Sequence, residues 1–119
     1  MIRLSKVSKQ FRTGVFALSD VSFEVEKGEF VFLVGPTGSG KTTIFRLLTR
    51  EYFPTGGEII VDNWDIVKLP GNKISHLRKK IGVVFQDLKL LMDRTIFENI
   101  ILPLEVSGIN PASSKKIVE

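Results

Sequence analysis

The sequence of 119 residues contains no cysteine and only one histidine, one tryptophan and one tyrosine. The absence of cysteine excludes disulfides, thiolate metal sites and thiol catalysis. No apolar run approaches the roughly 18 residues that a membrane-spanning helix needs, and the chain does not open with the charged and then apolar pattern of a signal peptide. We therefore expect a cytoplasmic protein.

What the sequence does contain is typical of one globular domain. Hydrophobic residues make up 43% and charged residues 25% of the chain, which is enough apolar material for a core and excludes a disordered chain. The formal net charge of +4 favours anionic partners, such as nucleotides, nucleic acid or an anionic membrane surface. Charge alone does not choose among these partners.

Hydrophobic periodicity predicts an alternation of strands and helices. Period-two alternation predicts half-buried antiparallel strands around residues 2–7 and 21–25, and continuous apolar runs predict buried strands at 29–34 and 81–85. We further expect a strand at 58–61 and helices at 42–50 and 74–80. Thr95 and Glu98 fit a capping box for a helix that Pro103 kinks or ends, and Asn110-Pro111 fits the start of a last helix. Because that helix shows no C-capping signal before Glu119, we expect the natural protein to continue.

The segment from Gly35 to Thr42 matches the pattern G-x-x-x-x-G-K-[ST] of a phosphate-binding loop. Glycines let backbone N–H groups approach a polyphosphate, and the helix that follows directs the positive end of its dipole at the same anion. Lys41 would contact the β- and γ-phosphates, Thr42 would offer a hydroxyl to Mg²⁺, and Thr43 could reach the α-phosphate. The predicted nucleotide-binding residues of this loop are Gly35, Pro36, Thr37, Gly38, Ser39, Gly40, Lys41, Thr42 and Thr43.

These motifs resemble the ATP-binding domains of ABC transporters along nearly the whole chain. Residues 35–42 look like the Walker A motif, residues 82–87 like the Q-loop, and residues 54–58 like the P-T-x-G-x segment between them. The resemblance implies an α/β P-loop NTPase fold with an antiparallel β subdomain, of which residues 1–119 would form the N-terminal part. Within the family, the chain is most similar to the branch that acts in bacterial cell division.

The resemblance also implies roles for two further residues. Phe11 would be the aromatic residue on which the adenine stacks, although it could equally be a core residue at the sheet edge, and Phe16 is a weaker competitor. Gln86 would be the Q-loop glutamine, in contact with Mg²⁺ and with the attacking water. A neutral amide can accept a hydrogen bond from water and coordinate a cation without changing the charge of the site. Gln86 and Lys41 are therefore the predicted catalytic residues, and Thr42 and Gln86 the predicted metal ligands.

Several motifs that this family needs for hydrolysis are absent from the sequence. There is no L-S-G-G-Q signature, no Walker B strand ending in Asp-Glu and no switch histidine. Asp62 follows a short apolar strand, but a turn position is the better interpretation, with Asn63 in a left-handed conformation. His76 fits a surface position. A run of basic residues, expected to be a solvated face, comprises Lys68, Lys73, Arg78, Lys79 and Lys80.

The resemblance finally implies a function for the full-length protein. It would bind and hydrolyse ATP with Mg²⁺ as a homodimer closed through the ATP sites, on the inner face of the cell membrane. Its partner would be an integral membrane protein of the FtsX type, and no nucleic acid is expected. The alternatives are an ATPase subunit of a lipoprotein or macrolide exporter, and a short nucleotide-binding module without hydrolysis. Residues 1–119 by themselves are expected to be inactive.

Overall fold

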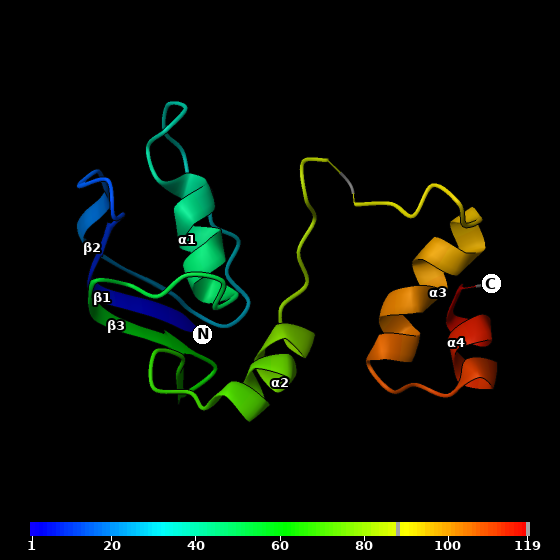
Figure 1. The fold of residues 1–119 in the computed structure, drawn as a ribbon. Helices are drawn as coiled ribbons and strands as arrows, with labels where there is room; N and C mark the ends of the chain where they lie inside the picture. Colours follow the sequence, from blue (N-terminus) through cyan, green and yellow to red (C-terminus); the bar gives the residue numbers. More distant parts are fainter. Residues whose placement is uncertain (88, 119) are drawn as a thin grey trace. The chain divides into compact units, whose positions relative to one another are not determined.

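The structure is a computed structural model that describes residues 1–87 and 89–118. The chain forms two compact units, Met1–Ile81 and Gly82–Glu119, whose helices and strands are shown in Figure 1. Among the described residues, no helix is both long and apolar enough to cross a membrane.

The first unit is built on a four-stranded antiparallel sheet in the order β2-β1-β3-β4. The strands are β1 (Ile2–Gln10), β2 (Phe16–Val25), β3 (Gly56–Val61) and β4 (Trp64–Asp65). The period-two alternation therefore predicted the first two strands correctly. Asp62 and Asn63 form the β3–β4 turn with φ angles of 48° and 66°, which confirms both as turn residues.

Two helices cover the apolar residues of this sheet. Helix α1 (Lys41–Leu48) follows the glycine loop, and α2 (Ile74–Lys79) follows the short 3-10 helix η1 (Gly71–Lys73). One buried cluster joins these helices to the strands, so the core of the unit fixes where α1 starts. The cluster comprises Leu4, Val7, Leu18, Ile44, Leu47, Ile59, Val61, Ile66, Leu69 and Leu77.

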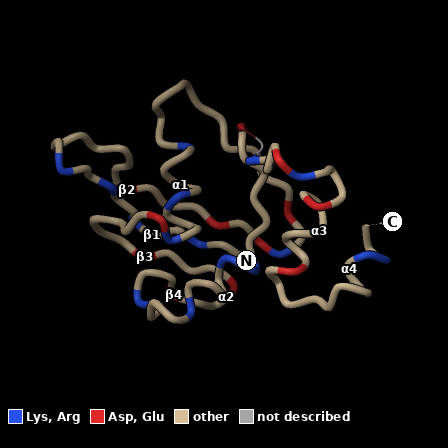
Figure 2. Tube along the Cα trace, turned by 45° about the vertical axis from the view of Figure 1, so that its right-hand side comes forward, with Lys and Arg blue, Asp and Glu red and all other residues tan. Residues whose placement is uncertain are grey.

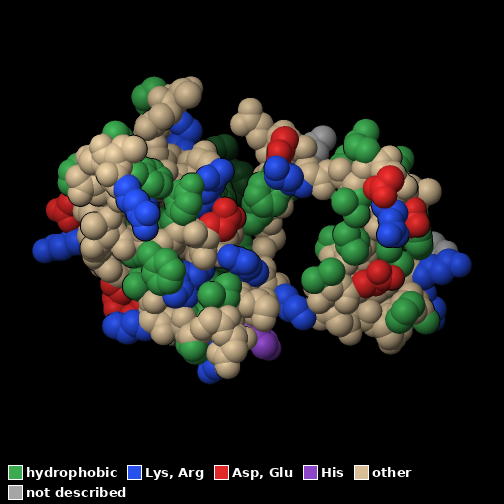
Figure 3. All heavy atoms as spheres, viewed as in Figure 1, with side chains coloured by type: hydrophobic (Ala, Val, Ile, Leu, Met, Phe, Trp, Pro, Cys, Tyr) green, Lys and Arg blue, Asp and Glu red, His purple; other side chains and the backbone are tan. Residues whose placement is uncertain are grey.

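The predicted buried strands at 29–34 and 81–85 do not form. Both segments lack regular secondary structure, and their apolar side chains are largely exposed, at 83% for Phe30, 84% for Val34 and 92% for Val84. A continuous apolar run is buried only where neighbouring strands pair with it on both sides. The described residues provide no such strands, since β1 to β4 pair among themselves. Apolar side chains therefore appear on the surface of the molecule (Figure 3).

The second unit contains two helices, α3 (Ile96–Val106) and α4 (Pro111–Val118). Helix α3 passes through Pro103 and continues to Val106, so the proline does not end it. The capping box predicted at its start is present, because Thr95 Oγ1 accepts from the Glu98 N–H at 3.2 Å and Glu98 Oε2 accepts from the Thr95 N–H at 2.8 Å. Asn110 Oδ1 likewise accepts from the Ser113 N–H at 2.9 Å, which confirms the predicted cap of α4.

This capping box lowers the pKa of the Glu98 carboxyl. The hydrogen bond from the Thr95 backbone, and then that from its hydroxyl, lower the pKa of the Glu98 carboxyl below its ordinary value of 4.5. Because the folded state favours the ionised form, the box contributes stability above pH 4.5 and loses it as the pH falls through the lowered pKa. We expect Thr95→Ala to raise the Glu98 pKa, since one of the two donors is removed. Carboxyl NMR titration of both proteins measures this, and an unchanged pKa would contradict it.

Candidate functional site

The predicted phosphate-binding loop leads directly into α1. Gly40 caps the helix in the left-handed region with φ 92°, and its carbonyl accepts the first helical hydrogen bond, from the Ile44 N–H at 3.0 Å. A turn within the loop is closed by the Ser39 N–H, which donates to the Pro36 carbonyl at 3.2 Å. The loop backbone and the N-terminus of α1 therefore form one continuous segment.

Gly40 also fixes the loop against the sheet. A Cβ atom at this position would lie 2.5 Å from the carbonyl oxygen of Ala17 and 2.6 Å from Leu18 Cδ2. Only a residue without a side chain permits this approach of the two backbones. The fixed glycine of the sequence motif is thus required here by packing as well as by its positive φ angle.

The Lys41 ammonium group lies against the loop that precedes it. Its Nζ donates to the carbonyl oxygens of Gly35 at 2.6 Å and Pro36 at 2.7 Å, and to Ser39 Oγ at 3.3 Å. A cation is therefore held at the centre of the loop by neutral oxygens, which phosphate oxygens could replace with a charge-assisted contact.

The first turn of α1 is suited to an anion. Thr42 is exposed and Thr43 is half-buried on this turn, and the turn carries no acidic residue that would repel a phosphate. The first N–H groups of a helix have no intrahelical partner, and the helix dipole adds partial positive charge at this end. Loop, lysine and helix terminus are thus brought together as the sequence predicted, and their arrangement can hold a polyphosphate.

Phe11 lies at the start of the loop that joins β1 to β2. Its N–H donates to the Val15 carbonyl at 2.9 Å, which closes a tight hairpin, and its ring meets that of Tyr52 edge to face, with centroids 5.4 Å apart. The ring is partly exposed and does not belong to the buried core. The competitor Phe16 is 60% exposed at the start of β2.

Residues around Phe11 form a cluster that sequence reasoning missed. Lys9 Nζ lies 5.3 Å from the Phe11 ring centroid and 5.6 Å from that of Tyr52, and the Arg46 guanidinium lies 5.3 Å from the Tyr52 centroid. No spacing rule connects residues that are about forty positions apart in the sequence. The one available signal was the presence of a single tyrosine close after the P-loop helix.

Gln86 belongs to the second unit, where it is exposed in a turn. Its neighbour Asp87 pairs with Lys89 at 2.5 Å, and the hydrogen bond from Lys89 lowers the pKa of the Asp87 carboxyl. The contact of Gln86 with Mg²⁺ and the attacking water stays a prediction.

Asp62 and three residues of the basic run have partners away from the loop. Lys80 pairs with Asp62, and its hydrogen bond lowers the pKa of the Asp62 carboxyl, so this acid is ionised and occupied by an ammonium group. Lys68 pairs with Asp65 at 2.7 Å. Arg78 Nε donates to the Thr49 carbonyl at 2.9 Å, just beyond the end of α1. His76 is exposed on α2, as predicted.

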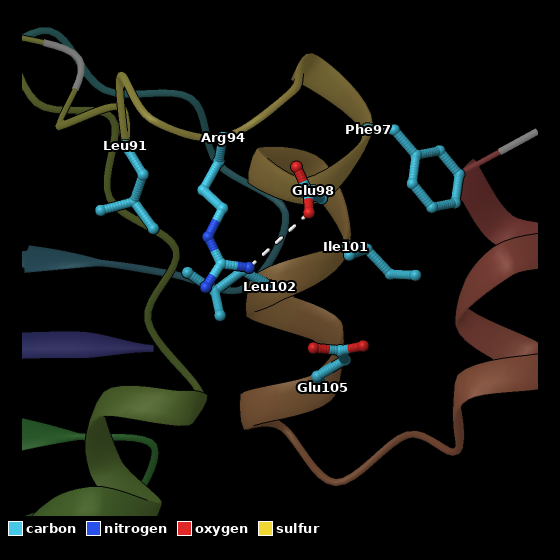
Figure 4. A pocket seen from close by; sticks show the side chains of 7 residues that line it. All are labelled: Leu91, Arg94, Phe97, Glu98, Ile101, Leu102 and Glu105. Atoms are coloured by element: carbon cyan, nitrogen blue, oxygen red, sulfur yellow. Dashed lines mark ion pairs between the residues drawn. The ribbon is translucent and has the colours of Figure 1, made fainter.

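A shallow hollow of about 270 Å³ lies in the second unit, on one side of α3. Figure 4 shows its lining side chains, with an ion pair at 3.7 Å between Arg94 and Glu98. The lining is mostly apolar and includes two acids, which disfavour a polyphosphate. We therefore do not assign nucleotide binding to this hollow, which is lined by Leu91, Arg94, Phe97, Glu98, Ile101, Leu102 and Glu105.

Comparison with known proteins agrees with this arrangement. Residues 18–119 match the family described as ABC transporter. The chain is 44% identical over 118 residues to the cell division ATP-binding protein FtsE of Bacillus subtilis, covering 99% of this chain and 52% of that protein. It is also 39% identical over 122 residues to the methionine import ATP-binding protein MetN of Photobacterium profundum, covering 100% of this chain and 36% of that protein. The chain thus spans about half the length of FtsE.

A solved structure shows the same fold. The dimeric post-hydrolysis state of the ATP-binding cassette MJ0796, bound to ADP and Pi, superposes with a TM-score of 0.88 at 33% identity, covering 99% of this chain and 54% of that one. The fold predicted from the sequence is therefore confirmed as the N-terminal part of an ABC ATPase cassette, an α/β P-loop architecture with an antiparallel β subdomain. Together with the match over residues 18–119, this shows that the chain belongs to the ABC transporter family.

Proposed function

We propose that this chain binds ATP with Mg²⁺ through residues 35–43. The main observation behind this proposal is the position of the Lys41 ammonium group at the N-terminus of α1. Its Nζ donates to the carbonyl oxygens of Gly35 at 2.6 Å and Pro36 at 2.7 Å. Phosphate oxygens take the place of these carbonyls when nucleotide binds, so that the ammonium, the loop N–H groups and the helix dipole all face the anion.

We propose Mg²⁺, which can be bound by a few protein oxygens together with phosphates and water, in preference to a metal ion that is bound by protein side chains alone. The described residues contain no group of three His, Cys, Asp or Glu side chains that could hold a metal ion. Mg²⁺ is commonly bound through one or two protein oxygens together with substrate phosphates and water. The Thr42 hydroxyl, in the first turn of α1, would supply one such protein ligand, and the ion would neutralise charge on the phosphates.

Equilibrium titration of the full-length natural protein with ATP in the presence of Mg²⁺ tests this proposal. We expect saturable binding of one ATP per chain, competed by ADP. A protein that folds but binds neither nucleotide would refute it.

For the full-length protein, we propose ATP hydrolysis as a homodimer. Lys41 would stabilise charge on the transferred phosphoryl group, and Gln86 would orient the attacking water. The dimeric MJ0796 cassette in a post-hydrolysis state with ADP and Pi supports both the dimer and the hydrolysis. Residues 1–119 lack the signature, Walker B and switch motifs, so we expect turnover only where the full-length protein supplies them.

The base of the nucleotide is proposed to stack on Phe11. Stacking on an aromatic ring is worth about 1–3 kcal/mol per base, so we expect Phe11→Ala to weaken ATP binding about five- to 150-fold. Binding of inorganic tripolyphosphate, which has no base, should not change. Phe16→Ala is the matched control and should leave both affinities as they are; a loss of ATP binding in that variant instead would transfer the stacking role to Phe16.

The biological role that we propose is that of FtsE in bacterial cell division, at the inner face of the membrane with an FtsX-like partner. The FtsE relatives, at 41–44% identity, support it. Apolar side chains exposed along α3, including Ile96, Ile100 and Val106, support a contact with another protein chain. A second candidate is methionine import, because MetN relatives reach 38–41% identity.

Purification of the tagged full-length protein from its own membranes separates these roles. Recovery of an FtsX-like protein supports the cell-division role. Recovery of the membrane subunit of a methionine importer, or of a lipoprotein or macrolide exporter, replaces it with the corresponding transport function. If the natural protein has a mass of 13.4 kDa and does not hydrolyse ATP, the interpretation that remains is a short nucleotide-binding module.

A further inference from the structure

We propose that Tyr52 is a positioning residue that sets the orientation of the Phe11 ring and thereby selects nucleotides that carry a base. The inference rests on the proposed stacking of the base on Phe11. It concerns a side chain for which the sequence motifs indicate no role.

The rings of Phe11 and Tyr52 meet edge to face. The planes of Phe11 and Tyr52 are inclined at 83°, with the centroids 5.4 Å apart, which is a favourable edge-to-face arrangement. Such a contact restricts rotation of the Phe11 ring and still leaves at least one of its faces uncovered by Tyr52. A ring of restricted orientation favours a stacked base, because less rotational freedom is then lost on binding.

Arg46 holds Tyr52 in place. Arg46 Nη1 donates to the Tyr52 hydroxyl at 2.5 Å, and the Arg46 carbonyl accepts from the Tyr52 N–H at 3.1 Å. The Arg46 guanidinium also lies 5.3 Å from the Tyr52 ring centroid, close enough for a cation–π contact, and 3.9 Å from the Glu51 carboxylate. Tyr52 thus has three contacts with Arg46, one at its hydroxyl, one at its N–H and one at its ring.

Arg46, which holds Tyr52 in place, lies on α1. Arg46 follows Lys41 by five residues on the same helix, and Figure 2 shows where basic residues lie along the chain, including α1. Five residues correspond to about 7.5 Å of helical rise. One rigid element therefore carries the predicted phosphate site at its start and the anchor of the aromatic pair near its end.

Lys9 completes the arrangement from β1. Its Nζ donates to the Phe53 carbonyl at 2.7 Å and lies within 5.6 Å of both ring centroids. The ammonium group therefore remains near the two rings, where its charge favours their negative faces. It holds the pair against the sheet, so that Phe11 is constrained from the strand and from the helix.

The test compares two ligands, ATP with Mg²⁺ and inorganic tripolyphosphate with Mg²⁺, in the full-length natural protein. We expect Tyr52→Ala to weaken ATP binding about three- to tenfold, the range typical of an aromatic pair, with less than a twofold change for tripolyphosphate. Tyr52→Phe keeps the ring and should bind ATP nearly as the unmodified protein does. Tyr52→Leu serves as a second variant if the alanine protein does not fold, and the same selective loss is expected of it.

The outcomes separate the inference from the proposed function. If Tyr52→Ala and Tyr52→Leu, which remove the ring, bind both ligands normally or lose both equally, the positioning role is overturned. If Phe11→Ala also leaves ATP binding unchanged, the stacking role falls with it. If the unmodified protein binds neither ligand, the nucleotide site itself is refuted, together with everything that rests on it.

Discussion

Lys41→Ala is expected to lower the affinity for ATP about thirty- to 150-fold. The change removes a charge-assisted hydrogen bond to phosphate, worth about 2–3 kcal/mol, from a loop that otherwise offers mainly backbone groups. The carbonyls of Gly35 and Pro36, which hold the ammonium group at 2.6 and 2.7 Å, would then face the incoming anion without a cation between them. Isothermal titration with ATP and Mg²⁺ measures the loss, and tripolyphosphate should lose as much affinity as ATP.

Lys79→Ala is the matched control. Lys79 is an exposed lysine on α2 in the same unit, so its removal changes the net charge by the same amount without touching the loop. Equal effects of the two substitutions would show that long-range charge, rather than the loop contact, governs affinity. Unchanged ATP binding in Lys41→Ala would refute the site assignment altogether.

Gly57→Ala should destabilise the first unit by about 2–5 kcal/mol. Gly57 is the second residue of β3 and has φ 88°, and a Cβ atom there would lie 2.3 Å from the Lys6 carbonyl oxygen and 2.6 Å from that of Ser5. The left-handed conformation costs an L-residue about 1–2 kcal/mol, and forcing apart two packed strands adds about 1–3 kcal/mol. Urea unfolding of the full-length protein, followed by the fluorescence of Trp64 near the end of β3, measures the change.

The neighbouring Gly56 supplies the comparison. It lies in the same strand, its φ is not in the left-handed region, and a Cβ atom there would meet nothing within 4 Å. We expect Gly56→Ala to change stability by no more than about 1 kcal/mol, in either direction. If both alanine variants lost the same stability, the close approach of Gly57 to β1 would not be its cause.

Beside the strands with period-two alternation, the sequence predicted correctly the features whose cause is local. The helix start at Thr95 follows from two side chains three residues apart, and the loop before α1 follows from fixed motif positions. The strands expected at 29–34 and 81–85 are absent from the described fold because a strand depends on partners from elsewhere, which an apolar run does not reveal. The contact of Phe11 with Tyr52 was missed for a similar reason, since only the folded chain brings together residues 41 positions apart.

The exposed run from Phe30 to Val34 has a consequence for the behaviour of the chain in solution. Five consecutive apolar residues with unpaired backbone groups form a template to which a second copy can add a strand. Phe30, Phe32 and Val34 are each more than three-quarters exposed, so such pairing would also cover side chains that water solvates poorly. We therefore expect residues 1–119 alone to self-associate at high concentration unless another strand covers this run.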